Sequence, residues 1–161
     1  MDKIFQRILE DNLADLAGLT VDASIPIPEK LVNEVIAVAL QGNKNITYCR
    51  ASIERQNHVE VELKTSFWPW PLALKLKLFK SADLAGAPKI RAFLENKVLL
   101  GKLGSLFGAL PEGVKIYDNQ VAVDIGFFLK DSDYLRFLEL IKAVEINTDM
   151  GKLILNVKIE R

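Results

Sequence analysis

The chain has 161 residues, of which 50% are hydrophobic and 26% charged, a composition typical of one globular domain with a sizeable core. Lysine and arginine (21 residues) balance aspartate and glutamate (21 residues), so the formal net charge of zero gives no long-range attraction to nucleic acid. The single Cys49 excludes an intramolecular disulfide, and one thiol with one histidine cannot form a zinc site without carboxylates. We therefore expect no metal, no cofactor and no nucleic-acid partner.

Residues 2–17 have an apolar stripe at helical spacing, and Gly18 follows as a left-handed stop. The polar face of this predicted helix is net acidic, which favours packing against its own domain or a second subunit over binding to an anionic membrane. Its acids also interrupt the apolar run that a signal peptide requires, so we expect a cytoplasmic protein, or a periplasmic one if the sequence is a trimmed mature domain. We expect one domain over residues 1–161, with this helix in 1–18 and a sheet-and-helix body in 19–161.

Alternation predicts a short strand from Val21 to Ile27, and Pro26 within it indicates a sheet edge. Pro28 suits the first turn of a helix, whose one-sided apolar face continues to Leu40 before Gly42 ends it. A strand over residues 46–54 and a turn at residues 56–57 are expected to follow.

Residues 58–80 hold the clearest periodicity in the chain and are predicted to form two strands joined at Trp-Pro-Trp-Pro. In each strand, valine or leucine alternates with mostly polar or charged residues, so one face is expected to be buried and the other wet. Lysines gather on the wet face, where they either hold an anionic headgroup or pair across strands with Glu60 and Glu62. We favour the second interpretation, because oppositely charged rows on neighbouring strands are typical of a solvated sheet face.

The rest of the chain predicts a strand over residues 89–95, a glycine-containing helix over 98–110 and a short strand over 114–117. A long strand is predicted over residues 120–129, followed by a helix capped by Asp131 or Ser132. The chain is expected to finish with a hairpin of strands 144–148 and 152–160 around Asp149-Met150-Gly151.

Two indoles, Trp68 and Trp70, lie at the predicted hairpin tip, each followed by a proline. An indole is apolar with one polar group, so this tip could contact a lipid interface or border a pocket. The alternative is that both rings fold back and cover the core.

No catalytic motif is present. His58 lacks an identifiable orienting partner, and Cys49 lacks sequence neighbours that would activate a thiol. The phosphate-binding, dinucleotide, zinc-protease and serine-hydrolase motifs are all missing. We therefore expect a protein that is not an enzyme.

The order of elements resembles a single module of the tubular lipid-binding (BPI-like) superfamily. The resemblance rests on IPIPEKLVNEVIAVAL, where an edge strand runs straight into a one-sided helix, on the successive alternating strands, and on LPEGVKI, which enters a further strand. It spans residues 21–161. It implies a long curved antiparallel sheet that wraps an amphipathic helix and leaves an apolar groove for acyl chains.

We expect an α+β fold in which a curved antiparallel sheet of about seven or eight strands wraps around amphipathic helices. The expected function is non-catalytic binding of a lipid or other apolar molecule, with Trp68 and Trp70 as membrane contacts. The alternative is an interaction module whose apolar excess forms a homodimer interface around a filled core. The expected ligand-lining residues are Leu72, Leu74, Leu76, Leu78, Leu99, Leu103, Phe107, Val121, Val123, Ile125 and Phe127.

Overall fold

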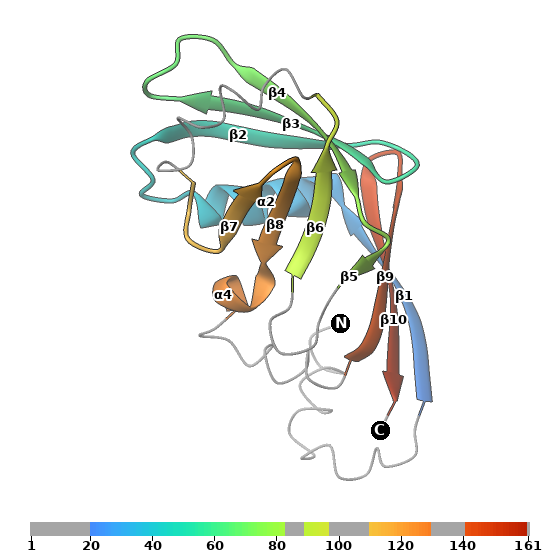
Figure 1. Ribbon diagram of the computed structural model, residues 1–161. Helices are drawn as coiled ribbons and strands as arrows, with labels where there is room; N and C mark the ends of the chain where they lie inside the picture. Colours follow the sequence, from blue (N-terminus) through green and yellow to red (C-terminus); the bar gives the residue numbers. More distant parts are fainter. Residues whose placement is uncertain (1–19, 83–88, 97–109, 130–140, 161) are drawn as a thin grey trace.

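The structure is a computed structural model that describes residues 20–82, 89–96, 110–129 and 141–160. These residues form two antiparallel sheets (Figure 1). The larger sheet has six strands, in the order β2 (Ile46–Ile53), β3 (His58–Thr65), β4 (Leu72–Leu78), β6 (Lys89–Leu94), β8 (Gln120–Asp124) and β7 (Val114–Tyr117). The smaller has four, in the order β1 (Thr20–Pro28), β10 (Lys152–Glu160), β9 (Ile141–Asp149) and β5 (Ser81–Ala82).

Two helices accompany the sheets in the described part of the chain. The longer, α2 (Glu29–Ala39), follows β1 directly and contacts β2 and β1. In Figure 1 it lies beneath β2, within the curl of the six-stranded sheet. The shorter helix, α4 (Ile125–Leu129), follows β8. The helices predicted at residues 2–17, 98–110 and after Ser132 lie outside the described residues.

The antiparallel, curved sheet expected from the sequence is confirmed, and the described part of the fold is mostly β-structure with two helices. The strands divide into two sheets instead of forming one, which was not predicted. The division arises after β4, where the chain leaves the larger sheet. Ser81 then pairs with Glu145 of β9, so one continuous stretch contributes β4 to the first sheet and β5 to the second.

The central hairpin has the predicted pairing. Val59 lies opposite Leu76, and Leu63 lies opposite Leu72, so the apolar residues of β3 and β4 share one face. Glu60 lies opposite Lys75 as expected, whereas Lys77 lies opposite His58 and not opposite Glu62. The prediction of β1 as an edge strand is also confirmed by the order of the four-stranded sheet.

The predicted strand over residues 120–129 is wrong in its second half. The strand ends at Asp124, and Ile125 begins α4. The Asp124 carboxylate accepts a hydrogen bond from the backbone N–H of Phe127 (3.1 Å), which is the bond that an N-cap aspartate makes at the start of a helix. Ile125 and Phe127 therefore belong to a helix, although their alternation with Gly126 and Phe128 resembles that of a strand.

Two apolar cores form beneath the sheets. The first is built from Ile46, Leu63, Leu72, Leu74 and Leu94, with Trp68 and Leu40 packed against it. The second gathers around three buried residues of the smaller sheet, Val144, Ile146 and Val157. Leu78 packs against the second core, whereas Leu72 and Leu74 belong to the first, so the leucines of β4 serve both sheets.

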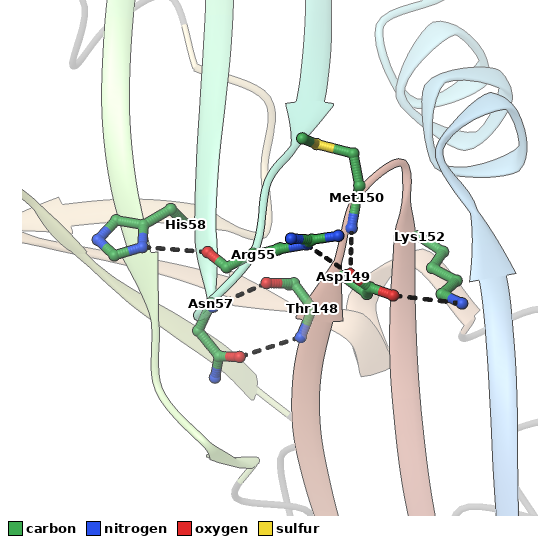
Figure 2. Close-up of polar contacts among 7 residues, drawn as sticks. All are labelled: Arg55, Asn57, His58, Thr148, Asp149, Met150 and Lys152. Atoms are coloured by element: carbon green, nitrogen blue, oxygen red, sulfur yellow. Dashed lines mark hydrogen bonds and ion pairs between the residues drawn. The ribbon is translucent and has the colours of Figure 1, made fainter.

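The buried side chain of Asn57 joins the two sheets (Figure 2). Its Oδ1 accepts a hydrogen bond from the N–H of Thr148 (3.0 Å), its own N–H donates to Thr148 Oγ1 (2.7 Å), and its Nδ2 donates to the Ile146 carbonyl (2.8 Å). Its carbonyl accepts from the N–H of Leu78 (2.7 Å). Asn57 also has a positive φ of 64°, a conformation that asparagine tolerates better than most residues.

We call this contact between the two sheets the joint, and the turn between β9 and β10 forms the rest of it. Its Gly151 donates its N–H to the Ile53 carbonyl and accepts a bond from the N–H of Glu29, both at 2.9 Å. Its Asp149 pairs with Arg55 (3.1 Å) and with Lys152 (3.5 Å) (Figure 2). The pKa of Asp149 lies below its ordinary value because the Met150 N–H and the Arg55 side chain donate hydrogen bonds to the carboxylate. These contacts of the Asp149 carboxylate at the surface reinforce the orientation of the β9–β10 turn.

The outer edge of β2 is covered by side chains of α2. Asn33 donates to the Ala51 carbonyl (2.8 Å) and accepts from the Ala51 N–H (2.7 Å), while Glu29 Oε2 accepts from the Ile53 N–H (2.8 Å). These bonds satisfy backbone groups that an edge strand would otherwise offer to another chain.

Replacing Asn57 with alanine is expected to lower the free energy of unfolding by about 2–4 kcal/mol, because it leaves the Thr148 N–H and the Ile146 carbonyl of β9 without their partner. Chemical denaturation of the purified variant and of the wild type measures this difference in the free energy of unfolding. Gln56→Ala is the matched control, since Gln56 is exposed and also has a positive φ, of 59°. Equal losses in both variants would show that backbone strain, and not the joint, sets the stability.

Asn33→Ala is expected to lower the free energy of unfolding by about 1–3 kcal/mol, because the Ala51 N–H and C=O lose their partner. Glu34→Ala is the control on the same helix, since its pair with Lys30 is exposed and long at 3.9 Å. Thermal denaturation and light scattering would follow both variants. The interpretation of Asn33 as an edge cover predicts that only Asn33→Ala also increases aggregation.

Candidate functional site

One face of the six-stranded sheet is apolar apart from the buried Thr65, which lies two residues after Leu63, and we call it the apolar face. Residues paired across antiparallel strands point to the same side, so the register identifies its members. They are Cys49, Ala51, Ile53, Val59, Val61, Leu63, Leu72, Leu74, Leu76, Leu78, Ile90, Ala92, Leu94, Val114, Ile116, Val121 and Val123. The opposite face carries most of the charged side chains of these strands.

Coverage of the apolar face decreases from one edge of the sheet to the other. At β2 to β4 half of its residues are buried, among them Ala51 (2% exposed) and Leu74 (8% exposed), and the others are half-buried. At β7 and β8 the corresponding residues, Val114, Ile116 and Val123, are only half-buried. Leu40, directly after α2, packs against the buried part, which places the helix on this side of the sheet.

The helix α2 carries exposed aliphatic side chains at Leu31, Val35 and Val38, and we call these three residues the α2 stripe. They follow one another at helical spacing and are 47%, 59% and 70% exposed. Ile36 and Leu40, by contrast, are half-buried. Both the α2 stripe and the open end of the apolar face can therefore contact an apolar molecule.

The structure brings most of the predicted lining residues together. Leu72, Leu74, Leu76, Leu78, Val121 and Val123 all lie on the apolar face. Ile125 and Phe127 lie on α4, where the Phe127 ring is so close to Gly113 that an added Cβ would approach it to 2.8 Å. The other three, Leu99, Leu103 and Phe107, lie outside the described residues.

Sequence analysis did not include Val114, Ile116 or the α2 stripe among the lining residues. Val114 and Ile116 could have been predicted to lie on the apolar face, because they alternate with Lys115 and Tyr117 over a short segment. Of the stripe, Leu31 and Val35 were predicted only as part of an apolar helix face, and Val38 was not predicted. The exposure of the stripe could not be foreseen, since hydropathy does not show which part of such a face is covered.

The two tryptophans have different environments. Trp68 packs against the first core, and its backbone N–H donates to Thr65 Oγ1 (3.2 Å). Trp70 is 70% exposed. Trp68 therefore folds back and covers the core, whereas the exposed Trp70 can contact an interface.

The surroundings of His58 contain a contact with a carboxylate and a shallow depression. Its Nε2 lies 3.3 Å from Glu95 Oε1, and its Nδ1 lies 3.2 Å from the Arg55 carbonyl. Glu54, Glu60 and Lys75 complete the polar lining. This lining includes no hydroxyl or thiol nucleophile. Within the described ranges, no group of three or more His, Cys, Asp or Glu residues is placed to hold a metal ion.

Cys49 lies on the apolar face, and burial raises the pKa of its thiol to about 11. A thiol with this pKa is almost entirely protonated at neutral pH, and the thiolate is the nucleophilic form. Cys49 therefore acts as a small apolar side chain of the sheet.

No family model, curated protein or solved structure matches this chain. Among the described helices, neither is long and apolar enough to cross a membrane. The apolar face and the α2 stripe are thus the features on which a function can be argued.

The raised pKa of Cys49 predicts slow reaction with a disulfide reagent such as 5,5′-dithiobis(2-nitrobenzoate) at pH 8. Compared with the chain unfolded in guanidinium, the folded protein is expected to react about a hundredfold more slowly, because far less thiolate is present. The absorbance of the released thiolate measures the rate, and the single cysteine makes the signal unambiguous. Similar rates in both states would contradict the burial of this thiol.

Proposed function

We propose that the protein binds a lipid or another apolar molecule without catalysing a reaction, and that the ligand lies between the open end of the apolar face and α2. The observation that carries this proposal is the decreasing coverage of a face on which every described position except Thr65 is apolar. The resemblance to the tubular lipid-binding superfamily supports the same function.

The energetic argument concerns the exposed aliphatic surface. Apolar surface removed from water contributes about 25 cal/mol per Å², so the α2 stripe and the residues of β7 and β8 would gain from contact with an acyl chain. Scattered apolar residues on a protein surface are ordinary, but an apolar sheet face with an amphipathic helix on the same side of the sheet is an arrangement that binding sites use.

In the proposed site, Leu72 and Leu74 belong to the buried floor, while Leu76, Leu78, Val121 and Val123 extend from it. Ile125 and Phe127 would contribute from α4, and Leu99, Leu103 and Phe107 complete the lining proposed from the sequence. Such a site would hold its ligand by apolar contact alone, because the apolar face provides no charged side chain to orient a headgroup. Selectivity would then depend on chain length and shape.

The α2 stripe also favours a second candidate function, an interaction module that forms a homodimer. Three exposed aliphatic residues on one helix are suited to packing against a copy of the same helix. Mass spectrometry of an organic extract, together with native mass spectrometry of the intact protein, separates the two functions. A stoichiometric lipid in the monomer supports the binding site, whereas a lipid-free dimer supports the module.

Val123→Trp and Leu76→Trp are expected to weaken binding of a dansyl-labelled fatty acid at least about tenfold, because the indole would occupy the space of the acyl chain. Fluorescence titration measures the affinity. Lys115→Trp is the matched control, since Lys115 lies on the opposite face of β7 and is exposed.

If the apolar face is instead fully packed, the same variants would bind no less fatty acid than the wild type. They would lose about 1–3 kcal/mol of unfolding free energy at each site through overpacking. Denaturation curves recorded beside the titrations therefore distinguish a binding site from a filled core.

A further inference from the structure

Exposed aromatic side chains gather at the tip between β3 and β4, residues 66–71, which we call the β3–β4 tip. Trp70 is 70% exposed and Phe67 is 46% exposed. Tyr48, on the neighbouring strand β2, is 39% exposed. Large aromatic groups are costly to leave in water, so a cluster of them at one end of a sheet indicates a contact surface.

The tip holds Trp70 in a restricted conformation. Pro69 and Pro71 fix the backbone on both sides of it, and Trp68 fastens the tip to the first core. Trp68 also receives local support through the bond from its N–H to Thr65 Oγ1. Little conformational entropy would therefore be lost when Trp70 enters an interface.

Basic side chains lie next to the tip. The loop before β2 runs beside it, since the Ser66 N–H donates to the Asn45 carbonyl (2.8 Å), and this loop carries the exposed Lys44. The ammonium of Lys64 lies 5.4 Å from the centre of the Tyr48 ring. The acids Glu54, Glu60 and Glu95 lie with His58, toward the other end of β3.

Charge and aromatic character thus coincide at one end of the six-stranded sheet. Glu62 is the acid nearest to Lys64 along β3, and it lies opposite Arg50 in the register, so these two charges offset each other. Within the part of the chain that the structure describes, Lys44 and Lys64 therefore leave a positive excess beside the exposed aromatic rings. A bilayer of anionic phospholipids has a negatively charged headgroup layer and an apolar interior. It therefore matches both the lysines and the aromatic rings at this end of the sheet.

We propose that this end of the sheet binds the surface of an anionic phospholipid bilayer. Trp70 and Phe67 enter the interfacial layer, where indole rings partition favourably, and Lys44 and Lys64 contact the anionic headgroups. The proposal is independent of the proposed function, because the tip needs no bound ligand to contact a membrane. It assigns a partner to a part of the surface that lies outside the apolar face.

Co-sedimentation with phosphatidylcholine vesicles, with and without phosphatidylserine, tests this proposal. The wild-type protein is expected to bind the phosphatidylserine vesicles more tightly and to lose this preference at high salt. Trp70→Ala should lower the partition coefficient at least about tenfold, and Lys44→Gln or Lys64→Gln about fivefold each. Met150→Ala is the matched control, since Met150 is 68% exposed at the distant β9–β10 turn, and it should bind as the wild type does.

Four results would overturn the proposal: no binding of the wild type to either vesicle, equal binding to both vesicle types, unchanged binding of Trp70→Ala, or an equal loss in Met150→Ala. Native mass spectrometry of Trp70→Ala completes the test, because loss of a wild-type dimer in this variant would assign the tip to a second copy of the chain. Circular dichroism of each variant establishes that it is folded.

Discussion

The arrangement of the two sheets depends on one buried polar group, the side chain and backbone of Asn57. An asparagine left unpaired at this position would be costly, so the hydrogen bonds to Thr148, Ile146 and Leu78 require β3, β4 and β9 to meet in one geometry. Apolar packing alone would tolerate small displacements between the sheets. The Asn57 bonds do not, because hydrogen bonds weaken steeply with distance and angle.

The orientation of the candidate site follows from this joint. The β9–β10 turn is fixed against β2, and through Gly151 it also holds the first residue of α2. Asn33 then aligns the helix along the edge of β2. The α2 stripe and the apolar face therefore keep a defined relation to each other. At the opposite end of β3, the β3–β4 tip is fixed by Trp68 and not by Asn57, so the two surfaces are stabilised by separate contacts.

Local patterns were sufficient to predict most strands and the pairing of the central hairpin, because alternation over 58–65 and 72–78 has only one physical explanation. The split into two sheets was not predictable, since it depends on the stretch after β4 pairing with β9, where Ser81 lies opposite Glu145, and the contact between the sheets depends on Asn57 meeting Thr148, a residue 91 positions away. The helix at Ile125 was missed because Asp124 acts through a hydrogen bond that alternation does not reveal. At the candidate site, the sequence indicated the face on which Leu76 and Val123 lie, but not which part of it is covered.

The four-stranded sheet pairs β1 with β10, the first and last strands of the described chain, from Thr20 opposite Glu160 to Pro28 opposite Lys152. During synthesis, β1 leaves the ribosome long before its partner exists, and it must wait without pairing to another chain. Pro26 and Pro28 lack N–H groups, so one side of β1 offers fewer donors to another strand. The same prolines that mark an edge in the finished sheet thus make that side of β1 a poorer template for another chain, both during synthesis and in the folded protein.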